Sequence, residues 1–168
     1  HQIEGVFTKN LYVIAISLIV LAIILAIAEK AGRFKRELKD LKWYDALLVG
    51  LAQACALIPG SSRSGTTITA GLFLGFTRET AARFSFLMSI PAVAASGLLE
   101  FYQSVKYFNT SGLINLIVGT IAAAIVGYFS IEFLLRYLKK KSTFLFIGYR
   151  IILGLIILIL ISQGIILP

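Results

Sequence analysis

The chain has 168 residues, of which 58% are hydrophobic and only 14% are charged. This composition excludes an ordinary soluble domain and indicates an integral membrane protein. The formal net charge is +8, but the basic residues gather at the ends of apolar runs, which is typical of membrane topology rather than of a nucleic-acid-binding surface. Cys55 is the single cysteine, so neither an intrachain disulfide nor a thiolate metal site can form.

The apolar runs predict an all-α membrane domain over residues 1–168, with four transmembrane helices and one helical hairpin. Leu11–Ala28 carries no charge and is long enough to cross a bilayer as a helix. Residues 30–42 form a basic cytoplasmic segment, either a short surface helix or a loop. The hairpin is expected at residues 44–76, and the other crossings at 80–101, 113–135 and 144–167.

Two short apolar segments, Tyr44–Ile58 and Thr66–Phe76, make up the expected hairpin. As helices they extend only about 22 and 16 Å, against a hydrocarbon core of about 30 Å, so neither crosses alone. They form either one broken crossing or a re-entrant hairpin. Re-entrance places eleven basic residues on one side of the membrane, against Lys9 and Lys106 on the other, whereas a crossing would separate the two basic clusters. We therefore expect re-entrance from the cytoplasm. The eleven residues are Lys30, Arg33, Lys35, Arg36, Lys39, Lys42, Arg78, Arg136, Lys139, Lys140 and Lys141.

A serine-rich segment, Leu57–Thr67, lies between the two short helices. Pro59 lacks an N–H and disfavours helix at the residue before it, so the backbone breaks here. A helix then restarts with Ser64 as the expected N-cap, and its free N–H groups face the same space as the Arg63 guanidinium. That guanidinium suits phosphate or carboxylate, and neighbouring hydroxyls can donate to the remaining oxygens. The segment therefore predicts an anion site made of Gly60, Ser61, Ser62, Arg63, Ser64, Gly65, Thr66 and Thr67.

These residues alone do not establish hydrolysis. The segment lacks the lysine of a Walker loop, and Ser64 replaces the second glycine of a nucleophile elbow. A serine here could attack phosphorus, but the only histidine is His1, at the terminus, so no general base is at hand. Three charged residues near predicted cytoplasmic helix ends are expected to snorkel toward water: Arg83, Glu132 and Arg150.

Three stretches of the sequence together resemble one membrane-protein family. They are Gly50–Gln53, Pro59–Thr67, and Ala81–Leu87 with Pro91. The pattern resembles the second half of the bacterial undecaprenyl-diphosphate phosphatases, the bacitracin-resistance membrane family, whose Pro-Gly-x-Ser-Arg-Ser-x-x-Thr motif is matched at every fixed position. The resemblance implies a multi-pass enzyme of the bacterial plasma membrane, built from two inverted repeats that each carry a re-entrant hairpin. Such an enzyme removes the terminal phosphate of undecaprenyl diphosphate and recycles the lipid carrier for cell-wall synthesis.

The resemblance also implies roles for single residues. Arg63 would grip the diphosphate, with Ser62, Ser64 and Thr67 hydrogen-bonding to it, and Arg63 and Ser62 are the expected catalytic residues. The family's first motif, with a Glu-x-x-x-Glu pair, a serine and a histidine, is not found, so the chain is expected to be the family's end portion. A divalent cation, Mg²⁺ or Ca²⁺, is implied with ligands in the preceding part, and no metal ligand is assigned within this chain.

The partners implied are a polyprenyl diphosphate lipid and the membrane, without nucleic acid, and a homodimer stays open. Another class of function, a lipid-phosphate transporter or flippase, also stays open, because broken helices that point their N-termini at anions are a transporter pattern. A type-two phosphatidic-acid phosphatase fits less well, because its Ser-Gly-His sequence and downstream histidine are absent.

Overall fold

The computed structural model describes residues 10–104 and 110–166, and the regular elements in these ranges are all helices. Four of the described helices are long and apolar enough to cross a membrane, which confirms the predicted fold class. They are α2 (Leu11–Ala31), α5 (Arg78–Ser104), α6 (Thr110–Lys140) and α7 (Phe144–Ser162). Two shorter helices, α3 (Trp43–Ala54) and α4 (Arg63–Phe73), lie between α2 and α5 in the chain, and short 3-10 turns occur at Leu38–Asp40 and Cys55–Leu57.

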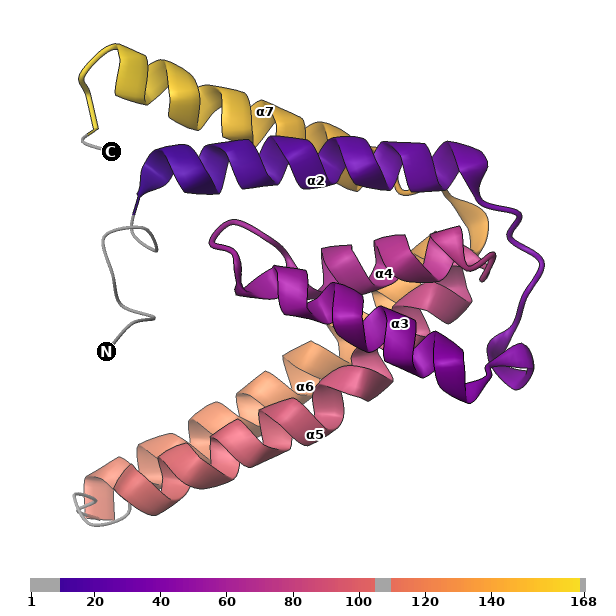
Figure 1. The fold of residues 1–168 in the computed structure, drawn as a ribbon. Coiled ribbons are helices and arrows are strands. Elements are labelled where there is room, and N and C mark those ends of the chain that lie inside the picture. The colour runs from indigo at the N-terminus through magenta and orange to yellow at the C-terminus, as the bar shows by residue number, and fades with distance from the viewer. Residues whose placement is uncertain (1–9, 105–109, 167–168) are drawn as a thin grey trace.

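Helices α2 and α7 lie side by side, α4 packs against α2, and α3 packs against α4, while α5 and α6 run together away from this group (Figure 1). Small residues allow α2 and α7 to approach closely. A Cβ added to Gly154 of α7 would lie only 2.7 Å from the Ile19 side chain and 3.0 Å from the Ala15 carbonyl oxygen of α2. Helix pairs in membranes use small residues in this way, because close backbone packing replaces the hydrophobic effect there.

The buried core lies where four elements meet. It is formed by Ala22, Leu25 and Ala28 of α2, Leu72 and Phe76 at the end of the hairpin, Ala81 of α5 and Ile147 of α7. Most apolar side chains of α5 and α6 are exposed instead. Such surface is stable in a bilayer, because lipid tails are as apolar as leucine.

The hairpin begins and ends at one place. The backbone N–H groups of Lys35 and Arg36 both donate to the Gly75 carbonyl at 3.0 Å, and the Thr77 N–H donates to the Arg36 carbonyl at 3.0 Å. The segment before α3 is therefore joined to the segment after α4. This geometry confirms the helix-loop-helix hairpin, and residues 32–42 form mostly a loop rather than a surface helix.

Arg36 connects the two segments that meet at the base of the hairpin, before α3 and after α4. Its Nη1 donates to the Asp45 carboxylate at 3.0 Å and to the Leu74 carbonyl at 3.1 Å, and its guanidinium lies 4.5 Å from the centroid of the Phe76 ring. Asp45 is fully buried, outside the four membrane-spanning helices, and the hydrogen bond from Arg36 lowers the pKa of its carboxyl group. The carboxylate therefore stays charged, and its contribution to stability is lost only as the pH falls through that lowered pKa.

A second ion pair joins three helix ends on the same side. Glu29, near the end of α2, is buried and accepts a hydrogen bond from Arg78 at the start of α5 at 2.6 Å. Its other oxygen accepts from the Thr143 hydroxyl, just before α7, at 2.8 Å. The end of α2, the base of the hairpin and the starts of α5 and α7 therefore lie on one side of the protein, which is also the side of the basic clusters.

The tip of the hairpin lies at intermediate depth. The Ser17 hydroxyl of α2 donates to the Pro59 carbonyl at the tip. Ser17 precedes Glu29 by a distance of about 18 Å along the helix axis, which is less than the hydrocarbon core of about 30 Å. The tip therefore stops inside the span of α2, as a re-entrant hairpin requires.

This arrangement gives a topology that labelling can test. In a background without the exposed Cys55, cysteines at Lys35 and Lys140 are expected to react with an impermeant reagent only from the cytoplasm. A cysteine at Thr110, the first residue of α6, is expected to react only from outside. Labelling of positions 35 and 140 from opposite faces would show that the hairpin segment crosses the membrane.

Candidate anion site at the broken helix

The tip of the hairpin packs directly on the backbone of α2. Gly60 has φ +82°, and a Cβ there would lie 2.5 Å from the Ile14 carbonyl oxygen and 2.9 Å from the Ile14 Cα. Only glycine combines this left-handed conformation with so close an approach. The Ser61 N–H donates to the Ile58 carbonyl at 3.0 Å and closes the turn over Pro59 and Gly60.

Ser62, rather than Ser64, is the N-cap of α4. Its backbone is extended (φ −81°, ψ 124°), and its hydroxyl accepts from the Gly65 N–H at 3.1 Å. The prediction of Ser64 was wrong because the turn ends at Ser61, so the helix already includes Arg63. The Ser64 hydroxyl lies 3.2 Å from that of Ser62. The Gly65 N–H is used by this cap, so the free N–H groups at the positive end of the helix dipole are those of Arg63 and Ser64.

The structure separates the predicted site residues into two groups. Ser62, Ser64 and Gly65 line one cavity, whereas the hydroxyls of Thr66 and Thr67 are buried and donate to the Arg63 carbonyl, each at 2.9 Å. Thr67 also shares a 2.6 Å hydrogen bond with Ser85 of α5.

The remaining predicted residues lie around this turn. The Arg63 side chain is exposed, and its guanidinium has no partner among the described residues. The Ser61 hydroxyl is buried and unpaired within the same part of the chain. Gly60 forms the turn itself. The assignment of Arg63 and Ser62 as catalytic residues, and of the others as phosphate ligands, stays a prediction.

The cavity beside Ser62 has a volume of about 380 Å³ and lies between α2, α4, α6 and α7. Its walls are mainly apolar, and three of its polar side chains, Ser62, Ser64 and Arg150, lie at the start of α4. An apolar cleft with a few convergent polar groups is the usual form of a small-molecule site. The polar side chains are Ser62, Ser64, Thr143, Tyr149 and Arg150, and the apolar ones are Leu18, Leu25, Ile68, Leu134, Leu138, Phe146 and Leu153.

Arg150 is the functional candidate that sequence reasoning missed. It was expected to snorkel to water, but only 7% of the residue is exposed, and its Nη2 donates to the Gly60 carbonyl at 3.2 Å. The prediction was wrong because the tip of the hairpin lies within reach of this side chain, which therefore meets protein rather than water. The available signal was an arginine among apolar residues of a membrane helix, a pattern that marks functional sites.

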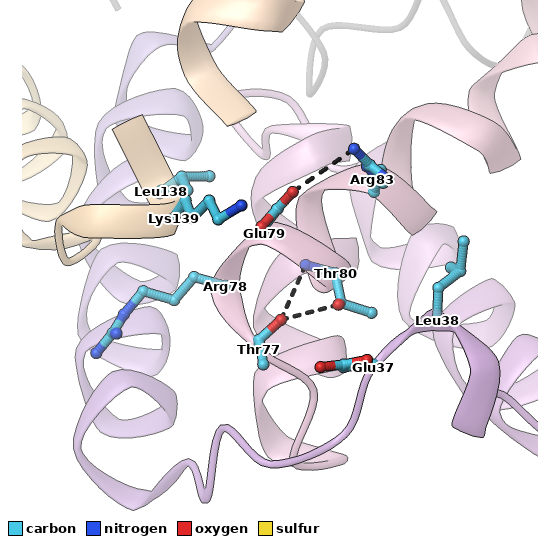
Figure 2. A pocket seen from close by; sticks show the side chains of 9 residues that line it. All are labelled: Glu37, Leu38, Thr77, Arg78, Glu79, Thr80, Arg83, Leu138 and Lys139. Atoms are coloured by element: carbon cyan, nitrogen blue, oxygen red, sulfur yellow. Dashed lines mark hydrogen bonds and ion pairs between the residues drawn. The ribbon is translucent and has the colours of Figure 1, made fainter. Parts of the chain in front are cut away.

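A second, larger cavity of about 450 Å³ lies near the base of the hairpin (Figure 2). Most of its polar side chains have partners, either within the lining or beside it. The Thr80 N–H donates to the Thr77 hydroxyl at 3.2 Å, and Arg83 lies 3.6 Å from Glu79. Arg78 points away from the cavity, toward its partner Glu29 (Figure 2). Most charged groups here are paired, whereas the cavity beside Ser62 contains a buried guanidinium with an unpaired Nε, so we place the candidate site in the cavity beside Ser62.

The residues of the candidate site do not by themselves fit a divalent metal ion. Mg²⁺ and Ca²⁺ prefer oxygen ligands that include carboxylates. The described lining residues offer hydroxyls and a guanidinium, without Asp or Glu. The cation suggested by the resemblance therefore needs ligands from other residues.

Four apolar helices with a broken, re-entrant hairpin between the first two define a multi-pass helical membrane protein. Comparison with known families then gives a definite assignment. Residues 1–156 match the model of the family described as bacitracin resistance protein BacA, and the chain belongs to that family.

Three curated relatives are each described as undecaprenyl-diphosphatase. The protein of Syntrophobacter fumaroxidans is 56% identical, over 90% of this chain and 54% of that protein. The protein of Chlorobaculum tepidum is 51% identical, over 100% of this chain and 62% of that protein. The protein of Chlorobaculum parvum is 49% identical, over 95% of this chain and 60% of that protein. The resemblance seen in the sequence is confirmed, and the chain spans about three fifths of the length of these relatives.

Proposed function

We propose that the complete protein hydrolyses undecaprenyl diphosphate to undecaprenyl phosphate and inorganic phosphate, and that this chain contributes the larger part of the enzyme. Family membership and the description of the relatives support this activity. The observation that carries it structurally is the cavity, where the start of a broken helix, two serine hydroxyls and a buried guanidinium meet an apolar cleft. Such a cleft suits a diphosphate head group on a hydrocarbon tail. By the same activity, the complete protein would recycle the carrier lipid for cell-wall synthesis and confer resistance to bacitracin.

The chemistry requires stabilisation of negative charge. As the bond to the terminal phosphorus breaks, charge grows on the bridging and terminal oxygens, and preorganised donors in a cleft of low dielectric stabilise it. The exposed guanidinium of Arg63 and the first N–H groups of α4 can supply such donors, with the Ser62 and Ser64 hydroxyls beside them. None of the described residues that line the cavity is a histidine or a carboxylate, so the general base must come from another residue.

A lipid-phosphate transporter is the alternative, because the start of a broken helix can also bind an anion that is moved rather than hydrolysed. Release of phosphate separates the two functions. A transporter would bind the lipid diphosphate and leave it intact, whereas the relatives' description favours hydrolysis.

The test is phosphate release by the complete protein, purified in detergent, from undecaprenyl diphosphate, with undecaprenyl phosphate as the control lipid. We expect release from the diphosphate only. Residues 1–168 alone are expected to release none, because their cavity lacks a general base among the described residues. Absence of release by the complete protein would contradict the proposed function. Release by residues 1–168 that Ser62→Ala abolishes would instead contradict the need for a base from elsewhere.

A further inference from the structure

Arg150, which has no role in the motif-based prediction, reaches the same cavity from a different helix. We propose that it is a second cationic ligand of the phosphate anion, acting together with the start of α4. That the anion is a diphosphate rests on the proposed function. That an anion binds here rests on the residues of the cavity.

Arg150 is a buried arginine whose charge has no carboxylate beside it among the described lining residues. A guanidinium has five N–H donors, and burying its charge is unfavourable unless it is paired and hydrogen-bonded. Within the described part of the chain, Arg150 donates from Nη2 to the Gly60 carbonyl, while its buried Nε has no partner. No aspartate or glutamate is among the described residues that line the cavity. A carbonyl group supplies no negative charge, so the guanidinium keeps charge and donors with which to bind an anion that enters the cavity.

The guanidinium of Arg150 lies close to the start of α4. A Cβ built on Gly65 would lie 2.6 Å from Arg150 Nη1 and 3.3 Å from the Ser62 hydroxyl. The guanidinium thus lies against the first turn of α4, at the positive end of the helix dipole. The guanidinium and the start of the helix are both positive, so they repel each other when no ligand is bound. Together they attract a negatively charged phosphate. The glycine at position 65 leaves the space that this arrangement needs.

A purely structural role makes a different prediction. If Arg150 only held the Gly60 turn, a side chain that donates one hydrogen bond would replace it, and anion binding would not change. If Arg150 binds phosphate, loss of its charge weakens anion binding even where the fold is intact. Binding of the anion therefore separates the two roles better than activity alone.

The experiment uses the complete protein with Arg150→Gln, and Arg136→Gln as the matched control, because the side chain of Arg136 is 79% exposed and pairs with Glu132 on its own helix. Affinity for inorganic diphosphate and for a short-chain polyprenyl diphosphate is measured by calorimetry, beside KM and kcat. We expect Arg150→Gln to weaken binding of both ligands by at least about tenfold, since one charged, bidentate contact is lost. The control is expected to match the wild type. A weaker affinity for the lipid alone would show that Arg150 serves the lipid and not the phosphate, and would overturn the proposal.

A second variant covers the case in which Arg150→Gln does not fold. Gly65→Ala keeps the charge but places a methyl group where Nη1 lies, so it displaces the guanidinium from the start of α4. We expect the same loss of diphosphate affinity. Unchanged affinity in either folded variant would overturn the proposal. Failure of the wild type to release phosphate would contradict the proposed function, while the binding of inorganic diphosphate would still decide the role of Arg150.

Discussion

Replacement of Arg63 by alanine in the complete enzyme is expected to lower kcat/KM for undecaprenyl diphosphate by at least about a hundredfold, because each 1.4 kcal/mol of lost transition-state stabilisation is about tenfold in rate. The guanidinium of Arg63 is exposed at the first turn of α4 and has no described partner, so it is free to bind the substrate. Arg63→Lys keeps the charge but loses the planar fork, and we expect an intermediate loss. The measurement is phosphate release at several substrate concentrations.

The matched control for Arg63 is Arg33→Ala, since Arg33 is also exposed but lies in the loop after α2. This variant is expected to keep the activity of the wild type. Amounts of inserted, folded protein are compared for all variants. An Arg63→Ala enzyme that inserts well and hydrolyses the lipid at an undiminished rate would show that the serine-rich segment does not bind the diphosphate through this residue.

Gly60→Ala is the second change with a large expected effect. The left-handed backbone of Gly60 costs an alanine roughly 1–2 kcal/mol, and the added methyl group would collide with the backbone of Ile14, which cannot move aside as a flexible side chain does. The tip would have to leave α2, carrying Ser62 and the Arg150 contact with it. We expect a lower melting temperature in detergent and a loss of phosphate release of at least about tenfold, by the conversion of 1.4 kcal/mol per factor of ten.

Gly97→Ala is the control for this change, because a Cβ at Gly97, within α5, meets no atom within 4 Å. It is expected to be neutral or slightly stabilising, since alanine is favoured over glycine inside a helix. If Gly60→Ala melted and turned over substrate like the Gly97→Ala control, the close packing of the tip on α2 would not be needed for the site.

Much of this architecture can be predicted from the sequence because the bilayer limits the choices. The length of each apolar run decides whether it crosses, and the positions of the basic residues decide that Tyr44–Phe76 returns to its own side. The N-cap of α4 was harder to predict, because Ser62 and Ser64 both suit the role. The choice depends on where the turn at Gly60 ends, and the Ser61–Ile58 hydrogen bond decides it.

The placement of Arg150 could not be predicted from its own helix. An arginine near the end of an isolated membrane helix extends to water, but the side chain of Arg150 instead reaches the tip of the hairpin and the first turn of α4. The sequence carries no local signal of this neighbour, since Gly60 and Arg150 are far apart in the chain. Contacts between distant segments therefore decide which charged residues belong to the site.

The shared carboxylate of Glu29 also bears on the order of assembly during synthesis. Its partner Arg78 follows it by 49 residues, and Thr143 follows it by 114. Until Thr143 has been made and α7 has packed on α2, one oxygen of a side chain that ends up buried lacks its final partner, and contact with water keeps it solvated. The Glu29 end of α2 is therefore expected to stay near the membrane surface during synthesis. Helix α2 reaches its final packing only when α7 packs against it.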